Sequence, residues 1–67
     1  MRLIRCKKDP KFAIPVHSID WVNMVEAAGG MYLIKIGTGG ITHLMDCETK
    51  QAADDFYEEI IEALREL

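Results

Sequence analysis

The chain has 67 residues, of which 49% are hydrophobic and 28% are charged, and its formal net charge is −3. This composition is typical of one small folded domain and excludes a disordered polymer. No run approaches the roughly 18 apolar residues of a membrane span, and the first residues lack a signal-peptide core, so we expect a cytoplasmic protein with no membrane partner.

The first segment is basic and extended. Residues 2–6 predict a short strand that ends at the turn-forming residues 7–10. The basic side chains of this segment are Arg2, Arg5, Lys7, Lys8 and Lys11. With Phe12 beside them, they offer phosphate contacts and a stacking surface for nucleic acid. The rest of the chain is acidic and would repel a polyanion, so nucleic-acid binding is an alternative and not our first expectation.

Short apolar segments in the middle of the chain predict further strands, at about residues 12–16, 19–26, 31–36 and 41–46. Pro15 has no amide hydrogen for a sheet ladder, so its segment is an edge or a bend. Glycine-containing turns join the later strands, which should pair antiparallel as a meander. The glycines of residues 37–40 could cradle a phosphate, but the chain continues into a strand instead of a helix, which favours a hairpin.

The last segment, at about residues 49–66, predicts one amphipathic helix with Thr49 as its N-cap. Its apolar side gathers Ala52, Ala53, Phe56, Ile60, Ala63, Leu64 and Leu67, with Tyr57 and Ile61 on one flank. Its acidic side presents Asp54, Asp55, Glu58, Glu59 and Glu62. The acidic side is typical of a solvated surface. Alternatively, the chain is an inhibitor or adaptor whose acidic helix binds a basic groove on another protein.

The residue types that carry metal or acid–base chemistry are few. Two cysteines and two histidines make a nominal zinc set: Cys6, Cys47, His17 and His43. Structural zinc ligands usually come in pairs within about five residues, but the two cysteines are far apart in the sequence, and so are the two histidines. We therefore predict no metal and no cofactor. Ser18 follows His17 directly in an extended segment, so their side chains point to opposite sides. We predict no catalytic residues, no enzymatic activity and no small-molecule substrate.

Large apolar side chains occur on both faces of the predicted strands: Trp21 and Val25 share one side, whereas Val22 and Met24 share the other. An antiparallel sheet with one wet face would alternate apolar and polar residues. One helix covers one face, so the sheet must curl into a partial barrel or bury its second face against another chain. Both solutions stay open. The interface candidates are Trp21, Met24, Tyr32, Met45, Tyr57 and Ile61.

Three stretches together with the acidic helix carry a family resemblance. Residues 12–19, 22–26 and 33–36, followed by a glycine turn and the helix, resemble the tail of small bacterial pleckstrin-homology-like proteins. They are also similar to the small flagellar proteins of the FlbD type. The resemblance covers nearly the whole chain and contains no functional motif. It implies an interaction or assembly module without catalytic residues to transfer.

The predicted fold is therefore α+β. A four- or five-stranded antiparallel, strongly bent sheet, forming a partial barrel, is followed by one C-terminal amphipathic helix. The predicted function is a small non-enzymatic protein–protein interaction module. Our first expectation is that it forms a homo-oligomer, and the alternative is that it binds another protein.

Overall fold

The computed structural model describes residues 2–5 and 12–67. Its elements in chain order are β1 (Leu3–Arg5), β2 (Ala13–Pro15), β3 (Trp21–Glu26), β4 (Tyr32–Thr38), β5 (Ile41–Cys47) and α1 (Lys50–Arg65), with short 3-10 turns at Val16–Ser18 and Ala28–Gly30. Every paired strand is antiparallel, and the helix comes last. The α+β fold class is confirmed.

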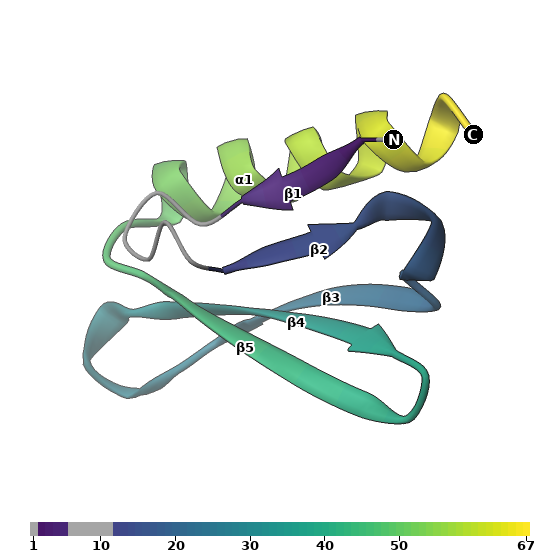
Figure 1. The fold of residues 1–67 in the computed structure, drawn as a ribbon. Coiled ribbons are helices and arrows are strands. Elements are labelled where there is room, and N and C mark those ends of the chain that lie inside the picture. The colour runs from purple at the N-terminus through teal and green to yellow at the C-terminus, as the bar shows by residue number, and fades with distance from the viewer. Residues whose placement is uncertain (1, 6–11) are drawn as a thin grey trace.

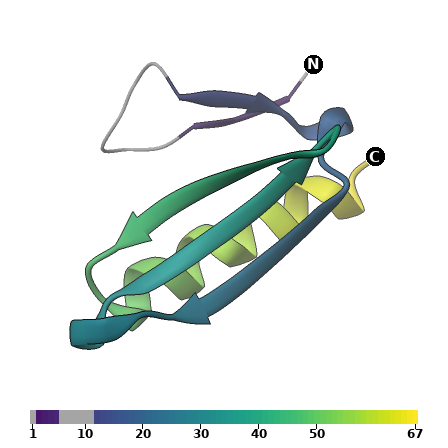
Figure 2. The same cartoon turned by 90° about the horizontal axis from the view of Figure 1, so that it is seen from below.

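The strands form two sheets, which differs from the predicted single bent sheet. β1 pairs only with β2, and we call this pair the hairpin sheet; β3, β4 and β5 pair in that order, and we call them the meander sheet. The chain leaves β2 at Pro15, which cannot donate to a ladder, and enters the 3-10 turn Val16–Ser18. This turn separates the two sheets, and the meander sheet is not closed into a barrel (Figures 1 and 2).

The glycine loop between β4 and β5 is a tight hairpin turn, as predicted. Gly39 and Gly40 have φ angles of 55° and 88°, values that side chains with a Cβ rarely adopt. Thr38 and Ile41 pair across the turn, so the loop consists of the two glycines. The carboxylate of Asp20 accepts a hydrogen bond from the Gly39 amide at 2.9 Å, which ties the turn to the start of β3.

Helix α1 packs across one face of the meander sheet (Figure 1). Ile60 of the helix and Ile34 and Ile36 of β4 are completely buried between them. The hairpin sheet and its 3-10 turn close one side of this core with Ile4, Ile14 and Val16. The hydrophobic core therefore lies on the helix side of the meander sheet.

The predicted helix cap is confirmed, because the Thr49 hydroxyl accepts a hydrogen bond from the Ala52 amide at 3.1 Å. Two members of the predicted apolar side are exposed to solvent instead, Ala52 in the first turn and Leu67 beyond the end of the helix. Ala52 lies near the start of α1, and Leu67 lies two residues beyond its last residue. In the described part of the chain, no helix is both long and apolar enough to span a bilayer.

Candidate interaction surface

One face of the meander sheet packs against α1, and the opposite face lies outside the hydrophobic core. We call it the outer face and define it by nine alternating residues: Trp21, Asn23 and Val25 on β3; Leu33, Lys35 and Gly37 on β4; and Thr42, Leu44 and Asp46 on β5. Figure 2 views the molecule from this side, with the strands in front of α1.

The register of the strands arranges these nine residues in three rows across the sheet. Trp21, Gly37 and Thr42 form the first row; Asn23, Lys35 and Leu44 form the second; and Val25, Leu33 and Asp46 form the third. Directly paired residues of an antiparallel sheet have Cβ atoms about 5 Å apart. Each residue of the outer face therefore borders its row neighbours, and the face acts as one continuous surface.

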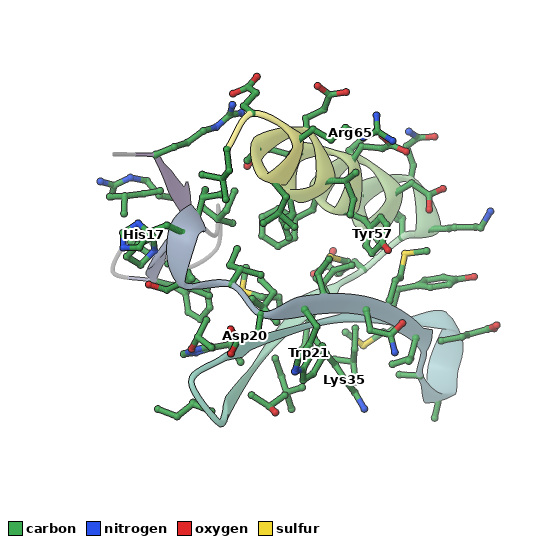
Figure 3. The ribbon with its side chains drawn as sticks, turned by 90° about the vertical axis from the view of Figure 1, so that its right-hand side faces the viewer. His17, Asp20, Trp21, Lys35, Tyr57 and Arg65 are labelled. Atoms are coloured by element: carbon green, nitrogen blue, oxygen red, sulfur yellow. The ribbon has the colours of Figure 1, made fainter. Side chains whose placement is uncertain are left out.

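Trp21 lies flat over the glycine beside it. A Cβ atom built on Gly37 would lie 2.1 Å from the Trp21 Nε1 atom and 2.2 Å from Cε2, so the indole occupies the space that any other side chain would fill. Gly37 is itself buried under this ring. Figure 3 shows Trp21 and Lys35 pointing away from α1 on the same side of the sheet.

The apolar side chains of the outer face are only partly covered. Leu44 is 58% exposed and Trp21 is 45% exposed, whereas Val25 and Leu33 are half-buried by their neighbours within the sheet. Among the residues that the structure describes, no helix or strand lies over this face. Monomeric proteins rarely expose large contiguous apolar patches unless these patches bind something.

The six predicted interface candidates do not share one surface. Trp21 lies on the outer face, but Met24, Tyr32 and Met45 alternate onto the opposite side and pack toward the core under α1. The remaining two, Tyr57 and Ile61, are half-buried residues of α1, and Tyr57 points toward the sheet (Figure 3). The prediction did not include Val25, Leu33 and Leu44. Alternation groups Val25 with Trp21 on β3, but it does not show which face of the sheet the helix covers.

The predicted acidic surface forms along the solvent side of α1. Its members Asp54, Asp55, Glu58, Glu59 and Glu62 are exposed or half-exposed. Some of them have partners within the helix: Lys50 Nζ lies 3.8 Å from an Asp54 oxygen, and Gln51 Nε2 donates to Asp55 at 2.9 Å. Such exposed pairs contribute little energy and leave the surface solvated.

The predicted basic segment falls only partly within the described residues. Lys7, Lys8 and Lys11 lie outside them. Arg5 is exposed, and the Arg2 guanidinium pairs with the Glu66 carboxylate just after the last turn of α1. The basic start and the acidic end of the chain therefore meet at this pair, and nucleic-acid binding by the segment stays a prediction.

The histidine and cysteine residues lie in separate places. His17 is exposed on the 3-10 turn Val16–Ser18 (Figure 3), whereas His43 and Cys47 are on the helix side of β5, and Cys6 lies outside the described residues. The His43 Nε2 atom is 2.8 Å from the Thr38 hydroxyl, and its ring meets Phe12 edge to face. Within residues 2–5 and 12–67, no three potential ligands gather in a metal-binding arrangement.

The chain was compared with family models, curated proteins and solved structures, and no match was found in any of the three comparisons. The resemblance to pleckstrin-homology-like and FlbD-type proteins therefore stays a prediction.

Proposed function

We propose that this chain is a small non-enzymatic interaction module that associates with a second copy of itself through the outer face of the meander sheet. The observation that carries the proposal is the exposed apolar surface of Trp21, Val25, Leu33 and Leu44, on a sheet whose other face is already filled by α1. Removing such surface from water is the main driving force of protein association.

The apolar side chains are distributed in a way that suits packing against another sheet. Leu44 and Leu33 lie diagonally across the β4 and β5 strands, and Trp21 and Val25 flank them on β3. Side chains from two facing sheets interdigitate across a layer about 10 Å thick. A second copy packed on this face would cover the leucines and part of the β3 side chains, as α1 covers the opposite face.

The size of the outer face sets the expected strength of association. Three strands about 4.8 Å apart and about 20 Å long present roughly 300 Å² in projection. Two such faces, with side chains standing out from the sheet, approach the total of about 1,000 Å² at which specific interfaces begin. Interfaces near this lower limit are typical of weak association, so we expect the dimer to be populated only at raised protein concentration.

Two variants test the proposal: one adds a negative charge to the outer face, and the other adds the same charge away from it. In Leu44→Glu a carboxylate replaces the most exposed apolar side chain of the face, and burying it unpaired against a partner is costly. The matched control is Leu67→Glu, because Leu67 is 73% exposed and lies beyond the end of α1, away from the outer face. Circular dichroism verifies that both variants are folded.

Sedimentation equilibrium provides the measurement. The wild type and Leu67→Glu should show a mass that rises with concentration from 7.6 kDa toward twice that value. Leu44→Glu should remain at the monomer mass throughout. Association that Leu44→Glu leaves unchanged would assign the interface to another surface, and a wild type that stays monomeric would refute the proposal.

A further inference from the structure

The outer face carries one positive and one negative side chain, and their placement has a consequence for how two copies meet. Lys35 lies directly opposite Leu44, and Leu33 lies directly opposite Asp46, on the neighbouring strands β4 and β5. The two charges therefore occupy one diagonal of a four-residue square, and the two leucines occupy the other diagonal.

Neither charge is paired with another of the described residues. Every ion pair that the described residues form involves other groups, and Lys35 and Asp46 belong to none of them. Lys35 and Asp46 are diagonal neighbours about 7–8 Å apart along the sheet, and their side chains form no ion pair with each other in this structure. Figure 3 shows Lys35 extending away from the helix on the side of the outer face. Both charged groups are thus available to a partner.

A face with this arrangement is complementary to itself. When two identical faces meet about a two-fold axis that runs along the leucine diagonal, each leucine lies over its own counterpart. The same rotation places each lysine over the partner's aspartate, so two ion pairs form. An axis along β4 would instead oppose Lys35 to the partner's Lys35. Like charges in direct opposition suppress an arrangement, and complementary charges select one.

We propose that two copies of this chain pack outer face to outer face about a two-fold axis along the Leu33–Leu44 diagonal, with Lys35 of each copy against Asp46 of the other. This inference rests on the proposed function, and it adds the orientation in which the two copies meet and the charged residues that pair. A second copy is favoured over a different protein because the face holds both signs of charge, in positions that the rotation exchanges. From the standard strand spacings, the strands of the two copies would cross at roughly 70°, near the orthogonal class of sheet packing.

Charge reversal tests the pairing directly. Lys35→Glu places two glutamates against two aspartates in its own dimer, and Asp46→Lys places two lysines against two lysines. Each variant alone should associate at least about tenfold more weakly than the wild type. An equimolar mixture of the two variants forms one-to-one dimers in which both ion pairs have opposite signs. These mixed dimers should recover affinity to within a few-fold of the wild type.

Native mass spectrometry resolves the mixed dimer from each homodimer if one variant is labelled with nitrogen-15, and sedimentation gives the affinities. The double variant Lys35→Glu/Asp46→Lys is the control for effects within one chain, and it should also recover. Circular dichroism checks that each variant is folded. Recovery in the mixture supports the pairing, because repulsion confined to one chain cannot be relieved by a second chain.

The outcomes separate this inference from the proposed function. If the wild type dimerises, Leu44→Glu abolishes the dimer and the mixture is no stronger than its components, the outer face remains the interface and the charge pairing is overturned. The pairing is also overturned if both charge variants dimerise like the wild type. A monomeric wild type overturns the pairing together with the function on which it rests.

Discussion

The two faces of the meander sheet share the same three strands, yet only one of them is covered by another element of the described chain. On the helix side, Ile34 and Ile36 have no exposed surface at all. On the outer face, Leu44 and Trp21 leave about half of their surface in water. The difference arises because the described residues form one α-helix, 16 residues long, which can lie across only one face.

The two faces therefore contribute differently to the stability of the fold and to association. The covered face supplies the packing that holds the fold, since a single core in a chain of this length contributes only a few kcal/mol of net stability. The outer face adds little to the stability of the monomer, because its apolar side chains remain partly exposed to solvent. Substitutions on the two faces should therefore have different consequences, and the following experiments use that difference.

The largest effect is expected on the covered face. Ile34→Ala removes three methyl or methylene carbons from a fully buried position, and such truncations cost about 2–5 kcal/mol. In a domain with a few kcal/mol of stability, this loss should unfold a large part of the population. Urea unfolding followed by circular dichroism measures it.

The matched control for this experiment is Leu44→Ala on the outer face, studied at a concentration where the chain is monomeric. Because Leu44 is already 58% exposed, its truncation should change the free energy of unfolding by less than about 1 kcal/mol. If the two alanine variants lost equal stability, the distinction between the covered and the outer face would be wrong.

An intermediate effect is expected where Trp21 lies on Gly37. Gly37→Ala places a methyl group where the indole now lies, so the ring must rotate away. The cost is partly offset because alanine is favoured over glycine inside a strand by about 0.5–1 kcal/mol. We expect a net change in stability below about 1 kcal/mol, together with a changed tryptophan emission spectrum.

The same variant should weaken self-association less than Leu44→Glu does, because Trp21 lies on the edge strand β3, away from the Leu33–Leu44 diagonal. Trp21 is the only tryptophan of the chain, so its fluorescence reports this position alone. An unchanged emission spectrum would show that the ring does not lie over Gly37.

The smallest effect is expected where the two charged ends of the chain meet, outside both faces. Arg2→Ala removes the pair with Glu66, and both side chains are largely exposed. Exposed ion pairs contribute about 0–1 kcal/mol and weaken as salt is added. A double-mutant cycle with Glu66→Ala measures the pair, and a coupling that persists at high salt would contradict this account.

The elements could be predicted from the sequence because their signals are local. Thr49 caps the helix through its own hydroxyl, and the Gly39–Gly40 pair fixes a two-residue hairpin turn. The division into two sheets could not be predicted in the same way. It depends on the path that the chain takes after Pro15, where the 3-10 turn carries Val16 into the core.

The candidate surface was predicted only in part. Alternation separates Met24 from Trp21 and Tyr32 from Leu33, but it does not tell which set the helix will cover, because both sets are apolar. The packing of α1 on the sheet determines which set is covered, and Met24, Tyr32 and Met45 lie on the core side. The contact between Trp21 and Gly37 depends on the register of two strands, and therefore on tertiary structure.

We expect the outer face, and no other surface, to be covered by a second copy. Nitrogen-15 NMR spectra recorded over a series of protein concentrations locate the covered surface, because each amide reports its own surroundings. We predict concentration-dependent shifts concentrated at Leu33, Lys35, Leu44 and Asp46, with α1 unaffected on its solvent side. Shifts centred on the acidic surface of α1, or spectra that do not change with concentration, would contradict the claim.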